Sequence, residues 1–231
     1  FVAKGLKLEG MTVAVNEDAN FTAFHVRIEN SQYVFDVQTP TEIIKDLQFG
    51  LPGKHNLTNA LMALAMAKTY GSPTEAIANA LMTFKGIKRR FSYQIKTDNL
   101  VYIDDYAHHP TEINAVHQAV RELYPNEKVL AIFQPHLFSR TRDFADDFAK
   151  SLSAFDEVLL LDIYPARELP MEGITSDWLL DKMTNDDTKV VSKSDLIPSI
   201  LKSNCKVIVT IGAGDIGELV KTIKVALNEN I

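Results

Sequence analysis

The chain has 231 residues, 46% of them hydrophobic and 23% charged, which is the composition of an ordinary globular protein. A formal net charge of −6 and the lack of any long lysine or arginine run argue against a nucleic-acid partner, and no apolar run has the length of a membrane span. A single cysteine, Cys205, excludes an internal disulfide, so we expect a cytoplasmic protein.

The first fifty residues alternate apolar and polar positions in three short segments, which is typical of β-strands. These predicted strands, which we expect to form an antiparallel meander, are residues 11–15, 22–28 and 32–37. A loop rich in glycine and proline then leads into a helical pattern over residues 56–67, rich in alanine and methionine. A second helix is expected over residues 72–84.

Three polar residues stand at the start of the first predicted helix: His55, Asn56 and Asn59. The free N–H groups and the dipole of a helix favour an anion at that position. A purely structural alternative has Asn56 capping the helix and His55 lying in the loop. The spacing alone favours the structural alternative.

A basic connector, Lys88-Arg-Arg-Phe91, follows the second helix, with a strand-like segment behind it at residues 91–95. Such a cluster is usually a solvated surface, but guanidinium groups also pair with phosphate oxygens. We predict a domain boundary here and divide the chain into residues 1–88 and 89–231.

Strands and helices alternate from residue 99 onward. The predicted strands are residues 100–105, 128–134, 157–162, 188–192 and 206–211. The predicted helices are residues 110–124, 140–154, 175–184, 194–203 and 214–228. This rhythm predicts a Rossmann-like α/β domain, with a mostly parallel sheet covered by helices on both faces.

Polar motifs follow three of these strands, at Asp104–His109, Gln134–Arg142 and Asp162–Glu168. The carboxyl ends of parallel strands meet at one edge of a sheet, so we expect the motifs to converge there. A glycine-rich loop, Gly212–Gly217, follows the last strand. Its spacing is similar to a dinucleotide fingerprint, which belongs after the first strand; we therefore interpret its glycines as allowing a tight turn.

These residues leave three chemical hypotheses. A metal site could use the nearby imidazoles and carboxylates, which are those of Asp104, Asp105, His108, His109 and His136. Acid–base hydrolysis is a second possibility, although no serine or cysteine has the context of a nucleophile. The third, which we favour, is transfer chemistry on anionic substrates recognised by Arg89, Arg90, Arg140, Arg142 and Arg167.

Several motifs, in order along most of the chain, resemble those of the Mur ligase family. They are Pro52-Gly-Lys-His-Asn-Leu-Thr-Asn59, Lys88-Arg-Arg-Phe91, Asp104-Asp-Tyr-Ala-His-His-Pro-Thr-Glu-Ile113, Phe133-Gln-Pro-His136, Ser139-Arg-Thr-Arg142 and Gly212-Ala-Gly214. The string that begins at Asp104 is specific to one branch, whereas the glycine loop and the His-Asn element are shared more widely within the family.

The resemblance implies an ATP-dependent, ADP-forming amide ligase that uses Mg²⁺ and joins L-alanine to UDP-N-acetylmuramate in peptidoglycan biosynthesis through an acyl phosphate. It also implies that residues 1–88 are the tail of a central α/β ATPase domain and residues 89–231 a C-terminal Rossmann-like domain. The branch that recycles murein peptides carries a different motif at Gln134-Pro-His136, so we favour the alanine-adding branch. A non-catalytic nucleotide or amino-acid binding module and a metal-dependent hydrolase are the remaining alternatives.

The resemblance also implies roles for individual residues. The residues expected to contact the nucleotide are His55, Asn56, Asn59, Arg90 and Asp105. Those expected to face the amino acid and the muramoyl carboxylate are Tyr106, His108, His136, Arg140 and Arg142, with His108, His136 and Arg140 as the catalytic ones. No metal ligand is expected in this chain.

Two departures from the family pattern concern anion binding. Leu137 stands where many members have an arginine, so one contact is lost or is supplied by Arg142. The phosphate loop ending in Gly-Lys-Thr-Thr and the Mg²⁺-binding glutamate are absent from the sequence, which opens with Phe1. We therefore expect a fragment of a longer protein, and we predict that it does not turn over ATP by itself.

Overall fold

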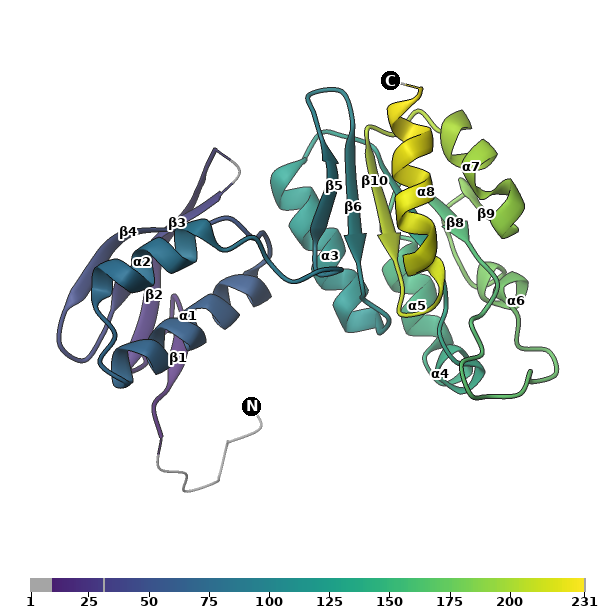
Figure 1. Ribbon diagram of the computed structural model, residues 1–231. Coiled ribbons are helices and arrows are strands. Elements are labelled where there is room, and N and C mark those ends of the chain that lie inside the picture. Colours follow the sequence, from purple (N-terminus) through teal and green to yellow (C-terminus); the bar gives the residue numbers. More distant parts are fainter. Residues whose placement is uncertain (1–9, 31, 231) are drawn as a thin grey trace. The chain divides into compact units, whose positions relative to one another are not determined.

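The computed structural model describes residues 10–30 and 32–230 (Figure 1). Its internal contacts divide the chain into two compact units, Phe1–Lys85 and Gly86–Ile231. The sequence had suggested a boundary between residues 88 and 89. Within the described ranges, every helix is too short or too polar to cross a bilayer.

The first unit is a four-stranded sheet packed against two helices. Its strands, in spatial order, are β1 (Val13–Val15), β2 (Phe21–Glu29), β3 (Gln32–Gln38) and β4 (Ile43–Phe49). The helices α1 (Lys54–Thr69) and α2 (Thr74–Thr83) close the core over inward side chains of the strands. Large apolar side chains such as Phe35 and Leu61 are fully buried in this core.

Two features of this sheet differ from the sequence-based prediction. The strands β2, β3 and β4 are antiparallel, but β1 runs parallel to β2, so the predicted meander is wrong for the first strand. The strand β4 was not predicted. Its alternation is broken because its pairing with β3 shifts register and Asp46 adopts a left-handed φ of 54°.

The second unit is a six-stranded sheet in the order β5-β6-β10-β7-β8-β9. Its strands are β5 (Ser92–Lys96), β6 (Val101–Asp105), β7 (Val129–Phe133), β8 (Glu157–Leu160), β9 (Thr188–Val190) and β10 (Val207–Ile211). Only β5, at one edge, is antiparallel to its neighbour. The prediction of a mostly parallel, Rossmann-like sheet is therefore confirmed.

Helices cover both faces of this sheet, and in Figure 1 α8 crosses in front of the strands. They are α3 (Pro110–Leu123), α4 (Phe138–Asp143), α5 (Ala145–Leu152), α6 (Ser176–Leu180), α7 (Lys193–Lys202) and α8 (Ile216–Asn228). Side chains of α3, α5 and α6 share one core with the sheet, and those of α7 and α8 share the other.

The single helix predicted over residues 140–154 is wrong, because the chain forms two helices that meet at Phe144. This residue leaves helical geometry, with φ −116° and ψ 22°, and its ring packs edge-on against His109 at 4.7 Å between centroids. A tertiary contact therefore accompanies the break in the helix, and no glycine or proline in the sequence predicts a break there.

The strand order creates a crevice at the carboxyl edge of the sheet. The last strand, β10, lies between β6 and β7, yet the helix that follows β10 covers the opposite face from those that follow its two neighbours. Loops leaving adjacent strands on opposite sides open a crevice, where open α/β sheets bind ligands. Backbone hydrogen bonds join the three loops there, from Gly212 N to Asp105 O (3.1 Å) and from Gln134 N to Ile211 O (3.1 Å).

Candidate active site

A row of aromatic rings runs along the carboxyl edge of the second sheet. The centroids of Tyr106 and His108 are 5.4 Å apart, those of His108 and His136 are 6.2 Å apart, and those of His136 and Tyr164 are 5.7 Å apart. The row links the loops after β6, β7 and β8. The predicted convergence of these three loops is therefore present in the structure.

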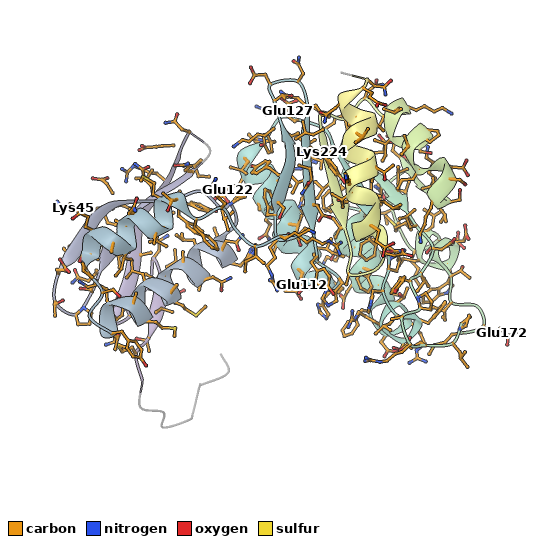
Figure 2. All side chains as sticks on the ribbon, viewed as in Figure 1. Lys45, Glu112, Glu122, Glu127, Glu172 and Lys224 are labelled. Atoms are coloured by element: carbon orange, nitrogen blue, oxygen red, sulfur yellow. The ribbon has the colours of Figure 1, made fainter. Side chains whose placement is uncertain are left out.

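A capping arrangement at the start of α3 orients His108. His109 is the N-cap residue and Pro110 opens the helix, while the Glu112 carboxylate accepts hydrogen bonds from the backbone N–H groups of His108 (2.8 Å) and His109 (3.1 Å). Glu112 lies at this edge of the unit (Figure 2). The Nδ1 atom of His108 is also 3.0 Å from the carbonyl oxygen of Tyr106, so both the backbone and the ring of His108 are fixed.

The loop after β7 brings a second imidazole beside an arginine. The Nη1 atom of Arg140 lies 3.5 Å from Nδ1 of His136. Burial lowers the pKa of His136 below its ordinary value, and the nearby Arg140 and His108 lower it further. The imidazole is therefore neutral near pH 7, so it can accept a hydrogen bond from the guanidinium or take up a proton from a reacting amine.

Two adjacent carboxylates at the end of β6 occupy different environments. Asp104 is 1% exposed, and its side chain is bound by the Arg89 guanidinium (3.1 Å) and the Thr210 hydroxyl (2.9 Å). Asp105 accepts hydrogen bonds from the backbone N–H groups of Phe91 and Ala107, each at 2.7 Å. Burial raises the pKa of both carboxyls, that of Asp105 to about 6, although the hydrogen bonds oppose the shift.

Gln134 clamps the glycine-rich loop after β10. Its side chain is buried, Oε1 accepts the backbone N–H of Ile216 (2.9 Å), and Nε2 donates to the Asp215 carboxylate (2.8 Å). Asp215 also pairs with Lys193. A Cβ atom on Gly214 would lie 2.4 Å from Gln134 Oε1, so the close approach of the two loops requires glycine there.

The start of α4 is held by Glu168, whose carboxylate accepts the backbone N–H of Ser139 (2.9 Å) and the Ser139 hydroxyl. These bonds lower the pKa of Glu168. Leu137, which stands at the N-cap with a left-handed φ of 73°, bonds through its N–H to Tyr164 O (2.9 Å). The exposed guanidinium of Arg142 pairs with Asp143 at 2.7 Å, so an anion at Arg142 would compete with that carboxylate.

The three predicted nucleotide contacts of the first unit lie in the first turn and a half of α1. The helix begins at Lys54 with Gly53 at its N-cap, so the alternative in which Asn56 caps the helix is wrong. The buried amide of Asn56 donates instead to the carbonyl of Pro52 at 2.7 Å. His55 and Asn59 are exposed.

In the second unit, Tyr106, His108, His136 and Arg140 lie together, and Asp105 is on the same loop as Tyr106. Arg90 is exposed, and its guanidinium forms no hydrogen bond or ion pair with any residue in the part of the chain that the structure describes. Across residues 10–30 and 32–230, no three histidine, cysteine, aspartate or glutamate side chains are grouped so as to hold a metal ion.

Sequence reasoning did not assign structural roles to Arg89, Gln134 or Glu112, which anchor the loops of the site. Arg89 appeared only as one of several candidate anion-binding arginines. The signal for Glu112 was available, since a glutamate three residues after a predicted N-cap indicates a capping box. The contacts of Arg89 and Gln134 join distant parts of the chain, so local patterns do not reveal them.

The second unit is thus a Rossmann-like α/β domain whose cations, imidazoles and carboxylates gather at the topological switch point. Comparison with known families identifies it further, since residues 89–215 match the family described as "Mur ligase, glutamate ligase domain". The chain belongs to the Mur ligase family.

Individual relatives agree with this membership. The chain is 74% identical over all 231 residues to a protein of Flavobacterium johnsoniae named UDP-N-acetylmuramate–L-alanine ligase, of which it covers 51%. It is similar to the crystal structure of the UDP-N-acetylmuramate–alanine ligase MurC of Thermotoga maritima, with a TM-score of 0.76 and 28% identity over 96% of this chain and 48% of the other. The chain spans about half the length of the curated relatives that it matches.

The fold is shared more widely. A murein peptide ligase from Psychrobacter arcticus has a TM-score of 0.63 with 23% identity, over 96% of this chain and 47% of that protein. At this identity the similarity concerns the fold alone.

Proposed function

We propose that this chain contributes the C-terminal part of the active site of an ATP-dependent, ADP-forming ligase that joins L-alanine to UDP-N-acetylmuramate. The observation that carries the proposal is the 74% identity, across the entire chain, to a protein named for that reaction. A cytoplasmic location is part of the proposal, since the one cysteine, Cys205, cannot form an internal disulfide.

The proposed reaction has two steps. A carboxylate oxygen of UDP-N-acetylmuramate attacks the γ-phosphorus of ATP, and the bond to the β-phosphate oxygen breaks to release ADP. The amine of L-alanine then attacks the activated carbonyl carbon; the bond from that carbon to the phosphate oxygen breaks, and the amine loses a proton. Positive charge and hydrogen-bond donors near the carbonyl would stabilise the tetrahedral intermediate.

Several features fit the binding of ATP. Each oxygen of the Asp105 carboxylate accepts one backbone N–H. Each oxygen therefore keeps a lone pair that can accept a hydrogen bond from a ribose hydroxyl. The exposed guanidinium of Arg90 is suited to a phosphate or ribose oxygen. In the first unit, Asn56 and Asn59 would contact the adenine, and His55 would border the nucleotide. Mg²⁺ would be held by residues other than these five.

The aromatic row would bind the amino acid and the carboxylate that it joins. Arg140 would neutralise the muramoyl carboxylate, and the neutral imidazole of His136 would accept the proton that the amine loses. Tyr106 and His108 would orient the amino acid, because the capping bonds at Glu112 hold His108 in place. Arg142 would contribute only if its bond to Asp143 opens.

An isotope experiment tests the chemistry of the proposal. We expect that UDP-N-acetylmuramate labelled with ¹⁸O in its carboxylate transfers one ¹⁸O atom to inorganic phosphate during turnover by the complete gene product. Phosphate free of ¹⁸O would rule out activation of that carboxylate by ATP. A second assay compares L-alanine with a murein tripeptide as the amine substrate for UDP-N-acetylmuramate, because preference for the tripeptide would favour peptide recycling.

A separate prediction concerns the 231-residue chain by itself. Its sequence contains no Gly-Lys-Thr-Thr phosphate loop, so we expect no ADP release when it is supplied with ATP, Mg²⁺ and both substrates. ADP release above the level of an Arg90→Ala, His136→Ala variant of the same chain would contradict this.

A further inference from the structure

The connector before β5 contains a residue in an unfavourable conformation. Arg89 has a left-handed φ of 61°, a region that side chains other than glycine seldom adopt. Its carbonyl oxygen accepts the backbone N–H of Tyr106 at 2.7 Å, which ties the connector to the loop after β6. A residue persists in such a conformation only when its surroundings hold it there.

Contacts of the Arg89 side chain with neighbouring residues hold it in this conformation. Its Nε atom donates to the buried Asp104 carboxylate at 3.1 Å, and its Nη2 atom donates to the carbonyl of Gly212 at 2.6 Å. The guanidinium carbon also lies 5.1 Å from the centroid of the Tyr106 ring. The side chain is 18% exposed. Arg89 therefore contacts the loop after β6 and the loop after β10 at the same time.

A glycine in α8 makes room for this side chain. A Cβ atom at Gly217 would lie 2.4 Å from Nη1 of Arg89 and 2.6 Å from its guanidinium carbon. Both distances are far below van der Waals contact, so any larger residue at 217 would displace the guanidinium. The glycine-rich loop after β10 thus leaves space for an arginine that comes from the connector.

These contacts distinguish Arg89 from its neighbour Arg90. The donors of Arg89 are directed at a carboxylate and a carbonyl of the chain itself, and its charge offsets that of Asp104. Arg90 is exposed. The pair Arg89-Arg90 thus contains one arginine that binds the protein and one that is open to a ligand.

We propose that Arg89 is a positioning residue for the candidate active site, a role that rests on the proposed ligase function. It fixes the backbone that carries Asp105 and Tyr106 and holds the Gly212–Gly217 loop against it, without contacting the reacting groups. Gly217 is its partner in this role. Because a misplacement of about 1 Å at a catalytic site can cost about a hundredfold in rate, loss of this support should strongly reduce turnover.

The first test measures amide hydrogen exchange without substrates in the complete gene product. In an Arg89→Ala variant, we expect amides in residues 104–107 and 212–217 to exchange about tenfold faster, with no change in β8 or α5. Gly217→Ala should affect the same two segments. A Lys221→Ala variant, which alters an exposed residue one turn further along α8, is the control and should match the wild type. Uniform acceleration across the second unit, or no acceleration, would overturn the proposal.

The second test uses the ligase reaction. We expect Arg89→Ala and Gly217→Ala each to lower kcat/KM about a hundredfold, with the double variant no worse than either single one, because both remove the same contact. Millimolar guanidinium should partly restore Arg89→Ala, through the open cleft of 750 Å³ that Arg89 lines, whereas urea should not. If the kcat/KM losses of the two single variants are fully additive in the double variant, Arg89 binds a ligand directly and the proposal is overturned. The same holds if activity falls without faster amide exchange in residues 104–107 and 212–217. An inactive wild type would count against the ligase function alone, since the exchange data still decide the role of Arg89.

Discussion

Replacing Gln134 by leucine tests whether the loop after β10 depends on a single buried amide. Leucine is slightly larger than glutamine, so the change leaves no cavity. It removes the acceptor of the Ile216 N–H and the donor to Asp215, at a position that is 2% exposed. The substitution therefore isolates two hydrogen bonds.

The expected loss of stability follows from those two bonds. A buried N–H group without an acceptor costs about 1–3 kcal/mol, and a hydrogen bond to a charged group contributes about 1.5–3 kcal/mol. Asp215 keeps its ion pair with Lys193, which places the second contribution at the low end. We expect the free energy of unfolding to fall by about 3 kcal/mol.

Urea denaturation followed by tryptophan fluorescence measures this loss. The chain has one tryptophan, Trp178, in α6 of the second unit, so its fluorescence reports on the unit that contains Gln134. The matched control is Gln94→Leu on β5, where the side chain is half-buried and bonds only weakly to Ser92 O (3.3 Å). A loss below about 1 kcal/mol for Gln134→Leu, or one equal to that of the control, would refute the reasoning.

Three further predictions concern other parts of the chain. Burial raises the pKa of Asp105 to about 6, from 3.8 when unfolded, so the folded state holds the proton of this carboxyl more tightly than the unfolded state does. The stability that this proton binding contributes is fully present below pH 3.8 and is lost as the pH rises through 6. Between pH 5 and 7.5 the wild type should lose about 1.4 kcal/mol relative to Asp105→Asn, measured by Trp178 fluorescence, and parallel pH curves would contradict this. Gly214→Ala should lower kcat/KM about tenfold or more, because its Cβ would lie 2.4 Å from Gln134 Oε1; unchanged kinetics would show that the loop adapts. Leu61→Ala, at a fully buried position, should destabilise the first unit by about 2–5 kcal/mol in circular dichroism, whereas a loss under about 1 kcal/mol would mean that the core closes around the gap.

The sequence predicted the second sheet well because its strands are continuous apolar runs separated by amphipathic helices. The same regularity predicted that the loops after β6, β7 and β8 would meet, and the aromatic row from Tyr106 to Tyr164 confirms that they do. The roles of individual site residues are a different matter. They depend on ligands, and they stay predictions.

The features that the sequence did not predict arise from contacts between distant residues. The break at Phe144 coincides with packing against His109, and β4 was missed because its bulge interrupts the alternation of buried residues. The structural role of Arg89 was missed for the same reason, since its side chain bonds to Gly212, which is 123 residues away along the chain. Local periodicity carries no record of such contacts.

The most direct test of the ligase assignment is product formation by the complete gene product. Supplied with ATP, Mg²⁺, UDP-N-acetylmuramate and L-alanine, it should form UDP-N-acetylmuramoyl-L-alanine with one ADP and one phosphate per amide bond. The same assay with His136→Ala should show a loss of turnover, because the neutral imidazole beside Arg140 is proposed to accept the proton that the amine loses. ADP release without the amide product, or no reaction at all in the wild type, would contradict the account.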